Sequence, residues 1–202
     1  MKKKALDLCS GLGGASEAFL RSRNWEVKRI ENNTILANIP ETTIIDVKQL
    51  AVALRNNRPG HIDLIWASPP CREFSNGFAS PKSQAARAGQ LDDYEPDMSI
   101  VNACLEIIEI CQPTYWVLEN VVGATRYLNP ILGEPRQIIG PFVLWGNFPL
   151  IDNAKAIPTS KKAKDVHSGN PLRANLKAKI PIELSQGLLD AIENQKTLDY
   201  WF

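Results

Sequence analysis

Short apolar runs alternate with stretches of helical periodicity along the first 120 residues, and this alternation constrains the fold more than any other feature. The apolar runs are residues 4–8, 25–30, 43–46, 62–66 and 115–118, and helical stretches cover residues 15–21, 47–55 and 98–111. Strands that alternate with helices are typical of a parallel sheet covered by helices on both faces. The chain is therefore predicted to be an α/β protein with a doubly wound, mostly parallel sheet.

The rest of the chain extends this prediction without adding a second domain. A further strand is expected over residues 141–145 and a last helix from about residue 181, with a loop between them. A length of 202 residues suits one ordinary domain. No apolar run approaches the roughly 18 residues that span a bilayer, and no apolar signal core follows the basic start. We expect a cytoplasmic protein without membrane association, and the sequence leaves its oligomeric state open.

Cysteine is presented at the tip of a stiff turn directly after the fourth apolar run. Pro69 and Pro70 precede Cys71, and proline restricts the backbone so that the next side chain is held in one direction. Loops at the carboxyl ends of parallel strands are where α/β proteins place their chemistry. Cys71 is therefore a candidate nucleophile. The four cysteines have neither CxxC spacing nor a metal-binding pattern with the two histidines, so we expect reduced thiols and no metal.

A glycine-rich turn follows the first strand, at residues 9–14. Glycines at the start of a helix let a ligand approach the backbone, but neither GxGxxG spacing nor a P-loop lysine is present. Glu31 and Asp46 end the next two strands, where an acidic residue usually binds ribose hydroxyls. These features favour a nucleoside ligand without a pyrophosphate.

A second acidic group is expected on the same edge of the sheet as Cys71. Glu119 and Asn120 end the strand at residues 115–118. A thiol beside a carboxylic acid suits covalent addition to a ring whose nitrogen the acid protonates.

Taken together, these motifs resemble those of the DNA cytosine-5 methyltransferases. The matching pieces are DLCSGLGG at residues 7–14, Glu31 and Asp46 at strand ends, SPPCREFS at residues 68–75 and LENV at residues 118–121. Their order and spacing match the family over roughly residues 1–125. The resemblance implies a Rossmann-like fold and transfer of a methyl group from S-adenosylmethionine to C5 of cytosine in DNA. It also implies that Cys71 adds to C6, that Glu119 acts at N3, and that the target base leaves the stack.

The resemblance assigns roles to particular residues of this chain. The catalytic residues would be Cys71, Glu119 and, for holding the cytosine or its backbone, Arg136. The cofactor-binding residues would be Asp7, Cys9, Gly11, Leu12, Gly13, Gly14, Glu31, Asn32, Asp46, Val47 and Pro69. The nucleic-acid-binding residues would be Arg72, Ser75, Lys82, Arg87, Lys161, Lys162, Lys164 and Arg173. Residues 75–97 would form a mobile active-site loop that closes on the substrate.

Several positions depart from the family pattern. Cys9 replaces an aromatic residue, Ser68 a glycine and Arg72 a glutamine. Arg136 is what remains of an arginine-rich motif, and residues 178–185 resemble the last helix motif without its Gly-Asn pair.

The target-recognition domain of the family is replaced by a short basic segment. Only residues 147–172 stand in its place, and residues 153–181 hold seven basic residues against one acidic residue, although the net charge of the chain is +1. Lysines can bind phosphates, whereas base readout needs a positioned helix or ribbon. We therefore expect double-stranded DNA as the partner, with low sequence specificity.

Other functions remain open at this point. The same chemistry could act on RNA or on a free nucleotide, and a modified form of the cofactor is compatible with Cys9 and Ser68. Ser68-Pro69-Pro70 is also similar to a motif of amino-methyltransferases, but Cys71 replaces the aromatic residue that ends that motif. A non-catalytic nucleic-acid-binding remnant of the fold is a further alternative, favoured by the missing recognition domain and the reduced arginine motif. Such a protein would have no need of a thiol facing an acid, which argues against it.

Overall fold

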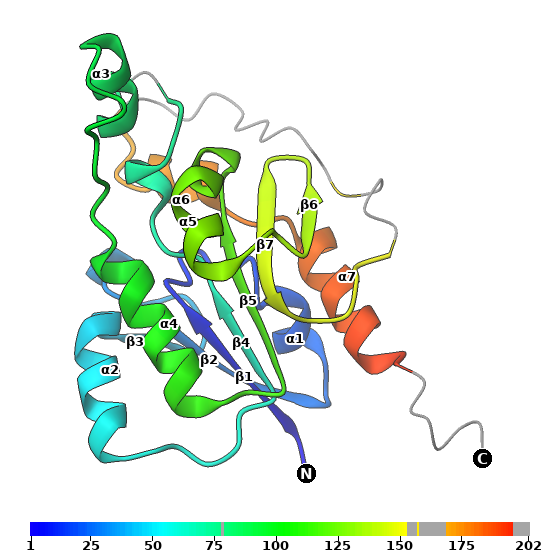
Figure 1. The fold of residues 1–202 in the computed structure, drawn as a ribbon. Helices are drawn as coiled ribbons and strands as arrows, with labels where there is room; N and C mark the ends of the chain where they lie inside the picture. Colours follow the sequence, from blue (N-terminus) through cyan, green and yellow to red (C-terminus); the bar gives the residue numbers. More distant parts are fainter. Residues whose placement is uncertain (78, 153–156, 158–168, 196–202) are drawn as a thin grey trace.

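The computed structural model describes residues 1–77, 79–152, 157 and 169–195. Its strands are β1 (Lys3–Leu8), β2 (Trp25–Glu31), β3 (Thr42–Ile44), β4 (Leu64–Ala67), β5 (Tyr115–Asn120), β6 (Gln137–Ile139) and β7 (Phe142–Asn147). Its α-helices are α1 (Glu17–Arg21), α2 (Val47–Asn56), α3 (Pro81–Arg87), α4 (Ser99–Cys111), α5 (Thr125–Leu132), α6 (Arg173–Ala178) and α7 (Ile182–Glu193), and short 3₁₀ turns are η1 (Thr34–Leu36), η2 (Cys71–Glu73) and η3 (Val122–Ala124). Figure 1 shows their arrangement.

The strands form a seven-stranded sheet in the order β3-β2-β1-β4-β5-β7-β6. The first five of these are parallel, whereas β7 runs antiparallel to both β5 and β6. All four residues of β4 are buried, as expected for a strand covered on both faces. The carboxyl ends of β1, β2, β4 and β5 consequently meet at one edge of the sheet.

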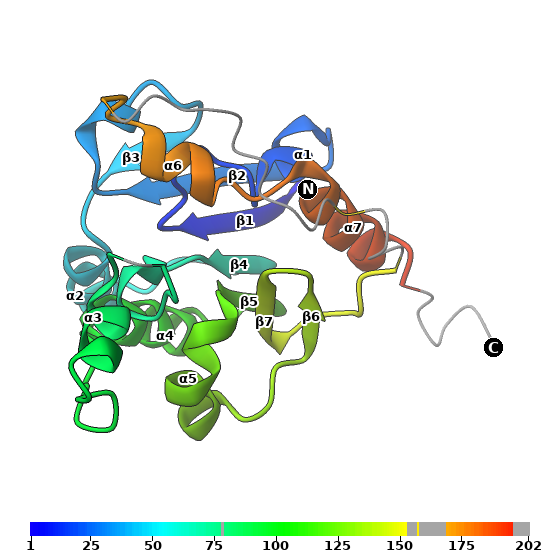
Figure 2. The same ribbon diagram turned by 90° about the horizontal axis from the view of Figure 1, so that it is seen from above.

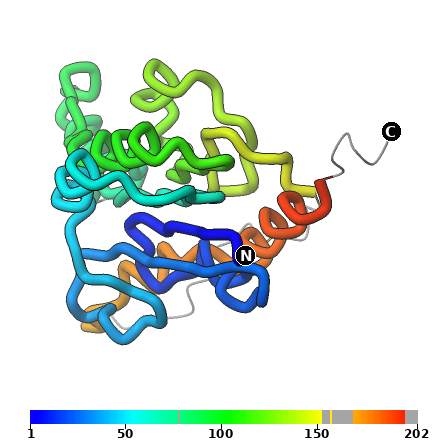
Figure 3. Tube along the Cα trace, turned by 90° about the horizontal axis from the view of Figure 1, so that it is seen from below, coloured from blue at the N-terminus to red at the C-terminus, as the bar shows by residue number. Residues whose placement is uncertain are grey.

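Helices cover both faces of the sheet, which confirms the predicted fold class. On one face α1 packs against α7, and on the other α2 packs against α4 (Figures 2 and 3). The α1–α7 contact includes buried hydrogen bonds: the Ser185 hydroxyl donates to the Ala15 carbonyl at 2.7 Å and accepts from the Ala18 amide at 3.1 Å. The last helix is thereby joined to the segment that follows the glycine-rich turn.

Four elements were not expected from the sequence. The polar segment after Ser75 contains α3, which Ser80 caps by accepting a hydrogen bond from the Ser83 amide. Pro130 lies within α5, where a proline argues against a helix. The strand β6 has three residues and α6 has six, too short for a periodic pattern.

No helix of the described residues is long and apolar enough to cross a membrane.

Candidate active site

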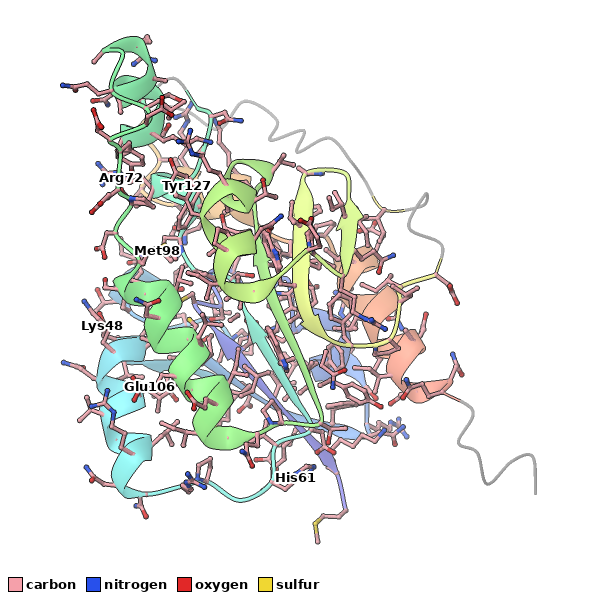
Figure 4. All side chains as sticks on the ribbon, in the orientation of Figure 1. Lys48, His61, Arg72, Met98, Glu106 and Tyr127 are labelled. Atoms are coloured by element: carbon pink, nitrogen blue, oxygen red, sulfur yellow. The ribbon has the colours of Figure 1, made fainter. Side chains whose placement is uncertain are left out.

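A cleft of about 1250 Å³ opens at the carboxyl edge of the sheet. Its walls come from the turns after β1, β2, β4 and β5 and from residues 170–180, on the side where α3 and α6 lie in Figure 1. Arg72 lies on this side of the molecule and His61 on the opposite side (Figure 4). The cleft gathers the predicted residues Cys9, Gly11, Leu12, Gly14, Glu31, Asn32, Val47, Pro69, Cys71, Arg72, Ser75, Glu119 and Arg173.

The Pro-Pro-Cys turn is held in place by hydrogen bonds on both sides of the cysteine. The side-chain amide of the buried Asn120 donates to the Pro69 carbonyl at 3.0 Å. The Cys71 carbonyl accepts from the amides of Phe74 and Ser75 at 3.1 and 2.9 Å, because Cys71 begins the 3₁₀ turn η2. Cys71 is half-buried and lines the cleft. Its position is therefore set by the backbone and by β5.

The unusual residue before the prolines has a local structural role. Ser68 accepts a hydrogen bond from the indole nitrogen of Trp66 at 2.8 Å. Trp66 is fully buried, so its N–H needs an acceptor inside the protein. Serine at this position supplies that acceptor, which a glycine side chain could not.

Glu119 reaches the same cleft from β5. Ala67 of β4 lies opposite Leu118 of β5 in the parallel register. Glu119 is the next residue of β5, so it lies opposite the start of the segment that leads from β4 into the Pro-Pro-Cys turn. The side chain lines the cleft and Glu119 is only 8% exposed. A thiol and a buried acid thus share one cavity.

Glu31 organises the glycine-rich turn. Its carboxylate accepts three backbone hydrogen bonds, from Gly11 at 2.8 Å, Asn32 at 2.9 Å and Asn33 at 3.0 Å. A carboxylate has about four acceptor sites. One acceptor site is therefore left for a hydroxyl group of a ligand in the cleft.

The glycines of this turn are required by close contacts. A Cβ on Gly14 would lie 2.2 Å from the Ile180 carbonyl oxygen, and Gly11 adopts φ +53°. Gly14 therefore allows the Ile180 backbone to pack against the turn, whereas Gly11 leaves room for a ligand at the turn.

Asp7 and Gly13 support the turn from beneath and do not line the cleft. The buried Arg29 donates to the Gly13 carbonyl at 2.8 Å and to the Ser16 hydroxyl at 2.9 Å. Ser16 in turn donates to an Asp7 carboxylate oxygen at 2.6 Å. Burial raises the pKa of Asp7 to about 7, although Ser16 and Arg29 favour its charged form. These contacts give Asp7 and Gly13 a supporting position under the turn, and their contact with the cofactor stays a prediction.

The raised pKa of Asp7 gives a testable pH dependence. Between about pH 4 and pH 7 the folded protein keeps a proton that the unfolded chain has lost, so the Asp7 contribution to the free energy of unfolding falls as pH rises. The fall is about 1.4 kcal/mol per pH unit. Asp7→Asn mimics the neutral acid. Urea titrations from pH 5 to 8 should show the wild type losing stability relative to this variant; a constant difference across that range would contradict the expectation.

Asp46 and Cys9 differ in how they meet the cleft. Asp46 caps α2, its carboxylate accepting from the Lys48 amide at 2.8 Å, and only its neighbours Ile45 and Val47 line the cleft. Cys9 lines the cleft directly. A hydrogen bond with the Cys104 thiol and burial raise the pKa of Cys9 well above its usual value. Cys9 is therefore a neutral wall of the cleft rather than a second nucleophile.

Arg136 does not line the cleft, so its role at the cytosine stays a prediction that its contacts do not support. Its guanidinium donates to the Phe148 carbonyl and lies 5.9 Å from the centroid of the Phe148 ring. Phe148 follows the end of β7, which runs antiparallel to β5. Gln137 pairs with Leu144, which in turn pairs with Glu119, so the backbone beside Arg136 lies near the level of Glu119. The guanidinium is nevertheless held at Phe148 and does not line the cleft.

The other predicted nucleic-acid contacts divide into three groups. Arg72, Ser75 and Arg173 line the cleft. Lys82 and Arg87 lie on α3 and do not line it, and the Lys82 ammonium is hydrogen-bonded within the chain. Lys161, Lys162 and Lys164 lie outside the described residues.

One wall of the cleft was foreseen only at Arg173 and in the motif at residues 178–185. Residues 170–180 close it opposite the glycine-rich turn, and the Asn175 amide nitrogen lies 3.9 Å from where a Cβ of Gly11 would be. Asn170 begins this segment, its side chain accepting from the Leu172 amide at 2.8 Å. The dipeptide Asn170-Pro171 was the one local signal of a turn leading into a helix.

Comparison with known proteins agrees with the motifs. The family model of the C-5 cytosine-specific DNA methylases matches residues 3–129. The chain is 28% identical over 155 residues to the type II methyltransferase M.AquIA of Picosynechococcus sp., covering 69% of this chain and 58% of that protein. It is 24% identical over 149 residues to M.DdeI of Desulfomicrobium norvegicum, covering 67% of this chain and 33% of that protein. The chain thus spans only part of the length of these relatives.

Among solved structures, the methyltransferase EhMeth of Entamoeba histolytica superposes with a TM-score of 0.44 at 17% identity. The superposition covers 76% of this chain and 55% of that one.

Proposed function

The chain belongs to the C-5 cytosine-specific DNA methylase family, and from this membership we propose that it methylates C5 of cytosine in DNA with S-adenosylmethionine as the methyl donor. The observation that carries the proposal is the cleft shared by the Cys71 thiol, the buried Glu119 and the glycine-rich turn with Glu31. This arrangement supplies a nucleophile, an acid and a ligand cradle at one edge of the sheet.

The cradle after β1 fits the proposed cofactor. Gly11, which lines the cleft without a side chain, allows close approach, and Glu31 keeps an acceptor site for a ribose hydroxyl. Cys9, Asn32, Val47 and Pro69 contribute further walls. When bound, S-adenosylmethionine supplies an electrophilic methyl group.

The chain's own residues activate the base. The sulfur of Cys71 forms a bond to C6, while Glu119 donates a proton or hydrogen bond to N3 and relieves the negative charge of the ring. C5 thereby becomes nucleophilic enough to accept a methyl group. Loss of the C5 proton then restores the C5–C6 double bond and expels the Cys71 thiolate. The sulfur reaches C6 only if the target base leaves the stack.

Double-stranded DNA is the proposed partner of the cleft. Arg72 and Arg173 bring positive charge to its lining, and Ser75 adds a hydroxyl group that can bind phosphate. Residues 75–97 adjoin the Cys71 turn and form the proposed active-site loop. Residues 1–202 form the proposed single catalytic domain.

The reaction is tested with labelled S-adenosylmethionine and mixed-sequence duplex DNA. Labelled 5-methylcytosine among the digested nucleosides would support the proposal. RNA and deoxycytidine nucleotides are assayed in parallel. Label in either of these and not in DNA would replace the proposed substrate, while label in none of the three would refute methylation of cytosine.

Specificity is expected to be low and binding strongly salt-dependent. Only 26 residues, 147–172, stand where the family carries its recognition domain, and they are rich in lysine. Such a segment can neutralise phosphates but offers little to base edges. Sequencing of methylated DNA should give a target of about two defined bases, and affinity should fall steeply between 50 and 200 mM salt. A single target of four or more bases, methylated without a partner protein, would contradict this.

A further inference from the structure

The ammonium of Lys82 connects the loop that carries Cys71 with the loop that follows Glu119. It donates to the carbonyl of Phe74 at 3.3 Å, to the side-chain oxygen of Asn76 at 2.9 Å and to the carbonyl of Gly123 at 3.1 Å. Phe74 lies three residues after Cys71, and Gly123 four residues after Glu119. These three contacts, here called the Lys82 bridge, join the two loops, and Lys82 and Gly123 are 41 residues apart in the sequence.

The two loops also touch directly at Gly123. A Cβ at this position would lie 2.1 Å from the Phe74 carbonyl oxygen and 2.9 Å from the Lys82 ammonium. Both distances are too short for any side chain without movement of the Cys71 loop, since the nearer atom belongs to the backbone. Gly123 therefore allows the close approach that the Lys82 bridge fastens.

The donors of Lys82 are fully used inside the protein. An ammonium carries three N–H groups, and the Lys82 bridge has three acceptors. Burial, with a smaller effect from the charge of Arg126, lowers the pKa of Lys82. A lysine placed to bind a DNA phosphate would instead be solvated and would have free donors. The contacts of Lys82 therefore suit a role within the protein better than the predicted contact with nucleic acid.

The later part of segment 75–97, around residues 92–94, also contacts the Cys71 loop and α5. Tyr94 donates to the Glu73 carboxylate at 2.6 Å, and its ring lies edge-on to that of Tyr127, with the ring centroids 6.3 Å apart. Arg126 forms an ion pair with Asp92 at 2.9 Å. Segment 75–97 thus rests on η3 and α5, which directly follow Glu119.

We propose that Lys82 is a positioning residue that sets Cys71 relative to Glu119 through the Lys82 bridge. The proposal rests on the proposed function, because the addition step needs sulfur at C6 and the acid at N3 of one base at the same time. A misplacement of about 1 Å in such a pair costs on the order of 100-fold in rate. Lys82 itself does not line the cleft, so its proposed effect is exerted through the two loops and not by contact with substrate or cofactor.

The test compares Lys82→Met, which keeps the length of the side chain but has no donor, with Lys48→Met on the exposed face of α2 as a matched control. For Lys82→Met we expect kcat to fall about 10- to 100-fold. The KM for S-adenosylmethionine and the salt dependence of DNA binding should stay as in the wild type. Lys82→Arg, which retains donors, should recover part of the rate, and Gly123→Ala should reproduce the loss.

Three outcomes would overturn the proposal. An unchanged kcat with weaker DNA binding and a salt slope reduced by about one would make Lys82 a phosphate contact. Parallel losses of cofactor binding and thermal stability would make it a general structural residue. An unchanged rate in Lys82→Met would leave it without a role.

Hydrogen exchange separates failure of this proposal from failure of the proposed function. Peptides covering residues 71–77 and 120–125 should exchange faster in Lys82→Met than in the wild type. Their exchange rates should be unchanged in Lys48→Met. This measurement needs no substrate, so it decides on the Lys82 bridge even if the wild type methylates no DNA. Unchanged exchange in both peptides would refute the bridge.

Discussion

Replacing Cys71 by alanine is expected to abolish methyl transfer. Alanine removes the sulfur that is proposed to add to C6, and no other described cysteine can take its place: Cys104 is fully buried and the thiol of Cys9 is held neutral beside it. Serine should fail as well, because a hydroxyl ionises far less readily than a thiol. The measurement is incorporation of label from S-adenosylmethionine into duplex DNA.

The Cys71 variants should keep the fold and bind the cofactor. The turn is held through backbone atoms, since the Pro69 and Cys71 carbonyls accept its hydrogen bonds. A matched control is Cys111→Ala, which removes a half-buried thiol of α4 that does not line the cleft. That variant should retain activity. Residual turnover in Cys71→Ala would contradict a covalent mechanism.

Glu119→Gln is expected to lower the rate of methyl transfer by about 10² or more, the usual scale for a general acid. Glutamine preserves the shape of the side chain, and its amide can still donate a hydrogen bond, but it cannot transfer a proton to N3. Glu119 is buried at the end of β5, so water cannot readily replace it as a proton donor. Single-turnover rates at saturating cofactor measure the effect.

The Glu119→Gln result is interpretable only if binding is intact. Equilibrium binding of S-adenosylmethionine should match the wild type, because Glu31 and the glycine-rich turn belong to other elements. Normal turnover in the variant would remove Glu119 from the acid role and leave activation of the ring to another group.

The parallel part of the fold and the chemistry at its edge could be predicted from sequence, because both depend on local pattern. Buried strands such as β4 are continuous apolar runs, and a side chain that directly follows a strand must lie at the carboxyl edge. That reasoning placed Cys71, Glu119 and Glu31 in one cleft. It could not distinguish Glu31, which lines the cleft, from Asp46, whose carboxylate caps α2 by accepting from the Lys48 amide.

What sequence could not supply depends on long-range contacts. Arg136 was assigned by motif order, but its guanidinium is held by the Phe148 carbonyl, a contact that no local pattern indicates. Lys82 was predicted to bind nucleic acid, and nothing in the local sequence indicates that its ammonium donates to the carbonyls of Phe74 and Gly123. Residues 170–180 have little apolar pattern, and only the packing of α7 on α1 brings them over the glycine-rich turn.

The hydrogen bonds of Ser185 to Ala15 and Ala18 have a consequence for synthesis of the protein. The ribosome delivers β1 and the glycine-rich turn first, yet the wall that covers this turn and the helix that fastens it are among the last described residues to be made. During translation the cradle remains open, and a chain interrupted before residue 170 would carry Cys71 and Glu119 without a closed cleft. Assembly of the cleft therefore requires nearly the whole described chain.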